Sequence, residues 1–191
     1  MNGTKCPVCG HTGKSRVFQL PKIQVPAYAF SVLGYDARSR TQSRQAAANA
    51  RGLEAFVRLI RKRLYPATAV DFPHDGEARH LVAFVGDAPI GIVRWRILVE
   101  NDVTCACIEF LGVVEQKRGQ GYGKQFVQRI VEDVSMTLQA MMSPVSKIVA
   151  DIPAQDADAA VKVFAANGFA IQQQPVMRDN QPYVRVYRSP L

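Results

Sequence analysis

The chain has 191 residues, of which 48% are hydrophobic and 21% charged, with a formal net charge of +8 at pH 7. This composition is typical of a globular protein with one sizeable core. No apolar run reaches the roughly 20 residues that span a bilayer, and the first residues lack a signal-peptide core. We therefore expect a cytoplasmic protein without a membrane span, whose positive charge favours anionic partners.

The chain begins with a cysteine motif, Cys6-Pro-Val-Cys9-Gly, followed by His11. Proline and glycine favour a tight loop that turns both thiolates toward one point, and His11 could supply a third zinc ligand. A tetrahedral site needs a fourth ligand, for which His74, His80 or another cysteine is available. A metal-free turn is the alternative, because the chain has no second Cys-x-x-Cys pair.

We expect residues 1–50 to form an N-terminal extension that contains this knuckle. Residues 14–33 carry short apolar pieces broken by prolines, so a strand there is short or lies at a sheet edge. Residues 34–49 are polar and arginine-rich, which is typical of a solvated linker that leads into a helix, or of an arm that binds nucleic acid.

From Arg51 onward, apolar residues recur at i, i+3, i+4 and i+7, which predicts a helix that ends before Pro66. The other face of this helix is basic and either solubilises the protein or contacts an acidic partner. Its members are Arg51, Arg58, Arg61, Lys62 and Arg63.

Residues 51–191 are expected to form one domain. β-Branched and aromatic residues predict a hairpin over 80–85 and 90–99 and a third strand over 104–114. A helix with one apolar stripe follows from Phe126 to Leu138, and then a strand over 147–152. A second helix runs from a cap at Asp156 to Asn167, and strands over 170–176 and 183–187 complete the sheet as a hairpin.

Alternation along the third strand gives its side chains two faces. Cys105 and Cys107 share one face and are expected to be small buried core residues rather than ligands. Glu109 and Leu111 should lie on the same face as Cys107.

Between the third strand and the following helix lies a glycine-rich turn, Arg118-Gly-Gln-Gly-Tyr-Gly-Lys124. Glycine lets the backbone pass close to an anion, and the free N–H groups and dipole of the next helix favour negative charge. The spacing fits neither the G-x-G-x-x-G dinucleotide fingerprint nor a nucleotide P-loop. The R-x-x-G-x-G pattern of Arg118, Gly121 and Gly123 resembles the pyrophosphate-binding turn of the GNAT superfamily, the acyl-CoA-dependent N-acetyltransferases.

The resemblance extends to the order of the predicted elements and to Ala160–Phe169, which is similar to a helix-to-strand segment of that family. It implies an α/β (α+β) fold, a GNAT-like mixed and mostly antiparallel twisted sheet flanked by helices, with acetyl-CoA as cofactor. The pantetheine arm would insert between two splayed strands and pair with the backbone of Leu111, Gly112, Val113 and Val114. The pyrophosphate would be surrounded by Arg118, Gly119, Gln120, Gly121, Tyr122, Gly123 and Lys124.

The resemblance also implies how acetyl transfer would proceed. Glu109 resembles the glutamate that removes the amine proton, although a salt bridge to Arg94 or Arg96 is the alternative. Family members often have a tyrosine close to the CoA sulfur, and Phe164 stands in its place. A phenyl ring keeps the packing but cannot protonate the thiolate. We therefore expect turnover slower by roughly 10²-fold, unless Tyr183, Tyr187 or water supplies the proton.

These features favour an N-acetyltransferase that moves an acetyl group from acetyl-CoA to an amine on a protein, a small molecule or an aminoacyl-tRNA. The basic surface would contact the tRNA or a protein partner, and a homodimer is also compatible with the sequence. One alternative is a catalytically weak GNAT-fold module that binds CoA or a partner within a larger complex. Another is a nucleic-acid-binding protein that uses the knuckle and the arginines.

Overall fold

We describe the protein from a computed structural model, which defines residues 30–36, 44–65, 74–100, 102–142, 145–178 and 180–190. The first helix has defined side chains from residue 51 onward. The predicted metal ligands Cys6, Cys9 and His11 lie outside the described residues, so a zinc site there remains a prediction.

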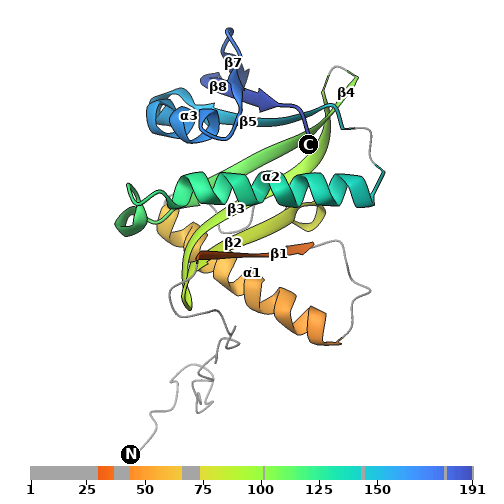
Figure 1. Cartoon of the computed structure of the whole chain (residues 1–191), viewed down its shortest axis with the longest axis vertical. Coiled ribbons are helices and arrows are strands. Elements are labelled where there is room, and N and C mark those ends of the chain that lie inside the picture. Colours follow the sequence, from red (N-terminus) through yellow and green to blue (C-terminus); the bar gives the residue numbers. More distant parts are fainter. Residues whose placement is uncertain are drawn as a thin grey trace, which may run out of the picture.

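The described chain combines three α-helices with β-strands, of which β2, β3 and β4 and then β6, β7 and β8 follow one another directly (Figure 1). The elements are β1 (Phe30–Asp36), α1 (Arg44–Leu64), β2 (Arg79–Val85), β3 (Ala88–Glu100), β4 (Val103–Val113), α2 (Tyr122–Ala140), β5 (Lys147–Pro153), α3 (Ala157–Ala165), β6 (Ala170–Ile171), β7 (Val176–Arg178) and β8 (Gln181–Arg188).

All eight strands join one sheet in the order β1-β2-β3-β4-β5-β8-β6, with β7 also paired to β8. Every neighbouring pair is antiparallel except β4 and β5, which are parallel. The mixed, mostly antiparallel sheet predicted above is therefore confirmed. β1 lies at the sheet edge, as expected for a strand in the proline-interrupted segment.

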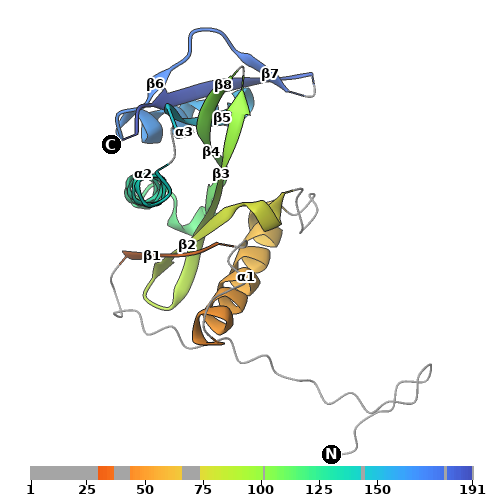
Figure 2. The ribbon, with the colours of Figure 1, turned by 90° about the vertical axis from the view of Figure 1, so that its right-hand side faces the viewer.

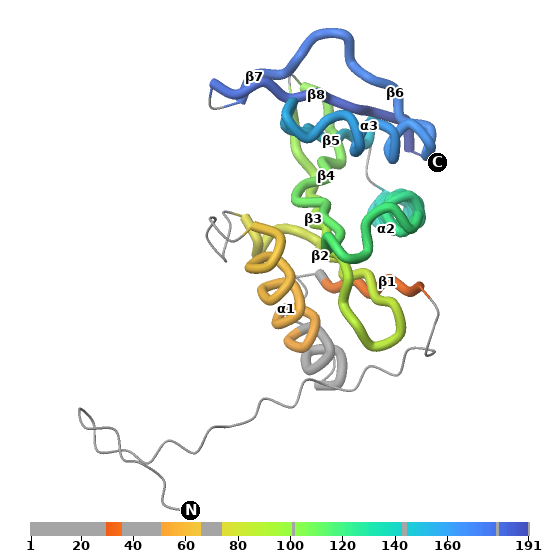
Figure 3. Tube along the Cα trace, turned by 90° about the vertical axis from the view of Figure 1, so that its left-hand side faces the viewer, coloured from red at the N-terminus to blue at the C-terminus, as the bar shows by residue number. Residues whose placement is uncertain are grey.

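Helices cover both faces of this sheet (Figures 2 and 3). α2 and α3 pack on one face, and α1 packs against β1, β2 and β3 on the other. The apolar stripe of α2 is buried from Phe126 to Leu138, which confirms the predicted packing helix. Leu53, Phe56, Val57 and Ile60 form the buried stripe of α1. Burying these stripes supplies the main driving force for this layered arrangement.

Three predictions about these elements were wrong. α1 begins at Arg44 and not at Arg51, because the residues after Arg44 are alanine-rich and favour helix without contributing to the apolar stripe. Arg61 is not on the basic surface but is 2% exposed, since it is ion-paired with Asp75. The predicted strand over 170–176 is two short strands, β6 and β7, separated by three glutamines and Pro175, which has no N–H to donate.

Candidate active site

The glycine-rich turn lies between β4 and α2, as the sequence predicted. Gly119 and Gly121 have φ values of 73° and 81°, a left-handed conformation that other residues adopt only with strain. Gly121 is the N-cap of α2, and a Cβ atom built on it would meet nothing within 4 Å. The open space beside its backbone therefore suits a ligand that approaches closely.

The first turn of α2 presents donors to this space. The N–H of Gln125 donates to the carbonyl of Gly121 at 3.3 Å, so the N–H groups of the preceding three residues have no earlier helical carbonyl to bind. No acidic residue lies in that first turn. The helix dipole and these free donors together favour an anion such as a phosphate.

Neighbouring elements hold the turn in place. The Nε atom of Arg118 donates to the carbonyl of Val113 at 3.0 Å, which fixes the turn to the end of β4. On the other side, the side-chain amide of Asn167, after α3, donates to the carbonyl of Lys124 at 3.2 Å. Hydrogen bonds from β4 and from the residue after α3 thus hold the conformation of the turn.

Next to this turn, β4 and β5 separate. They pair from Cys105–Lys147 to Ile108–Ala150, and beyond that point β4 continues beside β3 while β5 continues beside β8. The last residues of β4 therefore have a strand neighbour on one side only. The result is an opening between two otherwise adjacent strands, with the glycine-rich turn at its end.

Backbone groups of β4 face this opening in alternation. The N–H of Val114 donates to the carbonyl of Ile90 at 2.8 Å and so points toward β3. The carbonyl of Val113 accepts from Arg118, and that of Leu111 lies 3.5 Å from the Tyr65 hydroxyl. Because N–H and C=O of a regular strand residue point to the same side, and Val114 points toward β3, the N–H group of Val113 faces the opening. The predicted pairing of pantetheine with Leu111, Gly112, Val113 and Val114 remains a prediction, to which the free backbone groups of Val113 correspond.

A β-bulge changes the faces at the end of β4. Arg94 pairs with Glu109 and Ile92 with Gly112, so Val93 lies opposite two residues, one of which is Phe110 with φ 53°. Paired residues share a face, which places Glu109 and Gly112 on the same side of the sheet. The prediction that Leu111 shares the face of Glu109 was therefore wrong, because alternation does not continue through the extra residue.

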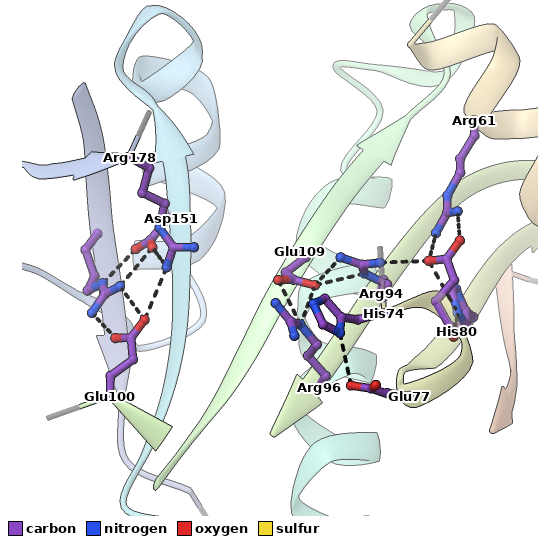
Figure 4. Close-up of polar contacts among 12 residues, drawn as sticks. Arg61, His74, Glu77, His80, Arg94, Arg96, Glu100, Glu109, Asp151 and Arg178 are labelled. Atoms are coloured by element: carbon purple, nitrogen blue, oxygen red, sulfur yellow. Dashed lines mark hydrogen bonds and ion pairs between the residues drawn. The ribbon is translucent and has the colours of Figure 1, made fainter. Parts of the chain in front are cut away.

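Glu109 belongs to a line of charged side chains on the α1 face (Figure 4). Its Oε2 atom lies 2.7 Å from an Arg94 nitrogen, and its Oε1 atom lies 3.2 Å from Nε of Arg96. Arg94 also contacts Asp75 at 2.8 Å, and Asp75 in turn pairs with Arg61. The salt-bridged alternative for Glu109 is thus confirmed. Both carboxylate oxygens of Glu109 thus accept hydrogen bonds from guanidinium groups.

His80 packs beneath the same line of charges. Its ring stacks on Tyr35 with centroids 5.0 Å apart, and its Nε2 atom lies 3.1 Å from the carbonyl oxygen of Asp75. Its side chain is 2% exposed, and this burial lowers the pKa of His80 from 6.5. His80 is thus a buried structural residue, and its role as a fourth zinc ligand remains a prediction because Cys6, Cys9 and His11 lie outside the described residues.

Tyr65 is a candidate residue that the sequence reasoning missed. It follows α1, and its hydroxyl lies 3.5 Å from the Leu111 carbonyl at the opening. A Cβ atom on Gly112 would come within 3.2 Å of that hydroxyl and 2.6 Å of Leu64, so glycine lets α1 approach β4 there. Only its position directly after an amphipathic helix could have indicated Tyr65, because no motif contains it.

A second charged cluster lies nearer the other end of β4 (Figure 4). Arg185 binds Asp151 and Glu100, and Arg178 from β7 reaches both carboxylates. Beneath it, Cys105 and Cys107 are buried free thiols, which confirms their predicted core role. Burial, followed by the charge of Glu109, raises the pKa of Cys107 to about 12, so this thiol is neutral and unreactive.

A cavity of about 600 Å³ lies beside this cluster, lined by residues that include Cys105, Lys147 and Tyr187. It is at the opposite end of the β4–β5 pair from the opening, and no residue of the glycine-rich turn lines it. The cavity is therefore separate from the predicted cofactor site.

The remaining predicted residues fall in different places. Phe164 is 2% exposed, and its ring packs edge-to-face on Phe169 with centroids 4.9 Å apart, within the core. Tyr183 pairs with Pro153 at the end of β5 that borders the opening, whereas Tyr187 lies by the cavity under Lys147. Tyr183 is thus the better placed of the two tyrosines considered as substitutes for the missing acid.

The described part of the chain contains neither a metal-binding cluster nor a membrane-spanning helix. Within it, no group of three or more histidine, cysteine or acidic residues is arranged to hold a metal. In the same ranges, no helix is long and apolar enough to cross a membrane.

Comparisons with solved structures agree with this architecture. An acyl-CoA N-acyltransferase from Pseudomonas aeruginosa matches with a TM-score of 0.55 and 15% identity over 84% of this chain and all of its own. Arabidopsis thaliana Naa50, in complex with the bisubstrate analogue CoA-Ac-MVNAL, matches with a TM-score of 0.55 and 17% identity over 84% of this chain and 98% of its own. Mutant forms of the spermidine/spermine N-acetyltransferase SpeG from Vibrio cholerae match with a TM-score of 0.54 and 13% identity over 85% of this chain and 95% of their own. At these identities the likeness concerns the fold.

No curated protein matches the chain significantly. The model of the GNAT acetyltransferase family matches residues 50–169, which is more than half of the chain and includes the glycine-rich turn, the opening and Glu109. The chain therefore belongs to the GNAT family and is an acetyl-CoA-dependent acyltransferase.

Proposed function

We propose that this protein is an N-acetyltransferase that binds acetyl-CoA between β4 and β5 and transfers the acetyl group to an amine that approaches from the α1 face. The observation that supports this most directly is the strand opening beside a glycine-rich turn whose left-handed glycines and helix N-terminus favour an anion. A pyrophosphate at the N-terminus of α2 would place the pantetheine arm along the free edge of β4.

The free edge of β4 would polarise the thioester. The N–H group of Val113 faces the opening, and a backbone donor near the carbonyl oxygen would stabilise the negative charge that develops during amine attack. The C–N bond forms as the C–S bond breaks, the amine loses a proton, and the CoA thiolate leaves or is protonated. With Phe164 buried in the core, we propose that Tyr183 or water gives that proton.

For Glu109 we propose a positioning role in addition to the predicted role in deprotonation. Its two oxygens are held by Arg94 and Arg96, so its first effect is to orient these guanidinium groups beside the path of the acceptor. Deprotonation of the amine through a water molecule at this carboxylate remains a prediction. The two roles differ in the pH dependence of turnover, which makes them separable.

The alternative of a catalytically weak CoA-binding module is motivated by Phe164. Thermal unfolding with increasing acetyl-CoA, followed by measurement of amine-dependent release of free CoA, distinguishes the two. Stabilisation with CoA release is expected for the enzyme, and stabilisation without release on any amine pool would favour the module. If acetyl-CoA does not stabilise the protein, both proposals fail.

A further inference from the structure

We propose that Arg96 binds a carboxylate of the acceptor, so that the preferred substrate is an amine that also carries a carboxylate group. This inference rests on the proposed function, because it concerns the acceptor side of the same site. It adds a substrate class to an activity that is otherwise defined only by its acetyl donor.

Arg96 has donors that nothing in the described chain uses. It lies on β3 opposite Cys107, and its Nε atom donates to both oxygens of Glu109 at 3.2 and 3.3 Å. A guanidinium group has five N–H donors, and the four on its two terminal nitrogens have no partner among the described residues. Its side chain is 18% exposed, so part of it meets solvent and can contact a ligand.

A series of ion pairs that begins at Glu109 orients the guanidinium group of Arg96. Arg94 holds Glu109, Asp75 holds Arg94, and Arg61 holds Asp75, so that α1, β3 and β4 all contribute to one line (Figure 4). The side chains of Arg94 and Arg61 are only 5% and 3% exposed. A side chain already ordered in this way loses little entropy when it binds an anion.

The chemistry of the site favours a carboxylate over a phosphate. Three arginines share the two carboxylates of Asp75 and Glu109 within this line. The terminal nitrogens of one arginine match the two oxygens of a planar carboxylate, with parallel hydrogen bonds. A phosphate, which carries more charge, is usually held by several cations or by a helix N-terminus, as at the glycine-rich turn on the other face.

The location fits an acceptor that reaches the opening. Glu109 lies on the α1 face, and Arg96 reaches it there, while α2 and the glycine-rich turn are on the other side of the sheet. Arg96 pairs with Cys107, four residues before Leu111, which corresponds to about 13 Å along the strand. Allowing for the length of the arginine side chain, the amine and the carboxylate of the acceptor should be about 8 to 13 Å apart.

The test compares ω-amino acids, with separations of about 8 to 13 Å between amine and carboxylate, with their uncharged carboxamides. The measured quantity is kcat/KM with saturating acetyl-CoA. We expect the native protein to prefer the carboxylates about tenfold or more. In Arg96→Gln the ratio of kcat/KM on the acids to kcat/KM on the carboxamides should fall to about one, and this ratio is the readout because losing the Arg96–Glu109 contact can also lower the rate on both substrates. Arg96→Lys keeps the positive charge but cannot form two parallel hydrogen bonds to a carboxylate, so this variant should retain only part of the preference.

Arg129→Gln is the matched control, because it removes one positive charge from an exposed arginine of α2 and should keep the full preference. Equal rates on acids and carboxamides, or a preference that survives Arg96→Gln, would overturn the inference while leaving the acetyltransferase in place. If Arg96→Gln does not fold, an unchanged preference in Arg96→Lys has the same consequence. Stabilisation by acetyl-CoA without turnover of any amine would instead refute the proposed function and this inference with it.

Discussion

Asp75 connects α1 to the centre of the sheet, and replacing it with asparagine should destabilise the protein strongly. Its carboxylate pairs with Arg61 and Arg94, whose side chains are 3% and 5% exposed. Removing one partner of a buried ion pair leaves a charge uncompensated and costs about 3 to 5 kcal/mol. Because 26% of the Asp75 side chain is exposed to water, we take the lower end, about 3 kcal/mol.

For a protein of this size each kcal/mol lowers the melting temperature by about 2 to 4 °C, so Asp75→Asn should melt about 6 to 12 °C below the native protein. The assay is thermal unfolding of both proteins without ligand at pH 7. Glu77→Gln is the control, because Glu77 is 67% exposed and pairs with the half-exposed His74. The reasoning is refuted if the two variants melt within about 2 °C of each other.

Three further predictions concern pH, cofactor and turnover. Burial lowers the pKa of His80 from 6.5, so below pH 6.5 the unfolded chain binds more protons than the folded protein. The unfolding free energy should therefore decrease as the pH is lowered below 6.5, by at most about 1.4 kcal/mol per pH unit. Urea unfolding should show this slope lost in His80→Gln and kept in His74→Asn, and a slope unchanged in His80→Gln would contradict the assignment. Gly121→Ala places a Cβ in the open space of the turn at φ 81° and should weaken CoA binding about tenfold or more in calorimetry, whereas Gly76→Ala should not. Glu109→Gln should slow turnover and leave CoA binding intact; full activity would place the base elsewhere, and an unaltered pH–rate profile at reduced rate would indicate positioning alone.

Local sequence patterns were sufficient for the elements that carry their own signal. The apolar stripe of α2 and the glycine-rich turn were predicted correctly, because helical periodicity and the left-handed preference of glycine act over a few residues. Cys105 and Cys107 were recognised as core residues for the same reason, since strand alternation is local. The predicted order of elements along the chain also held from β2 to α3, although α3 leads from β5 to β6, and β8 lies between these two strands in the sheet.

Long-range packing decided the rest of the site. The bulge at Phe110 depends on how β3 pairs with β4, and it alone moves Leu111 off the face of Glu109. Arg61 looked like a surface residue because its burial depends on Asp75, which no helical pattern links to it. The opening itself exists because β4 and β5 follow different partners beyond Ile108. Short-range patterns were thus enough to predict the fold and the glycine-rich turn, whereas the side chains and backbone groups that meet beside this turn come from residues far apart in the chain and depend on how the strands and helices pack.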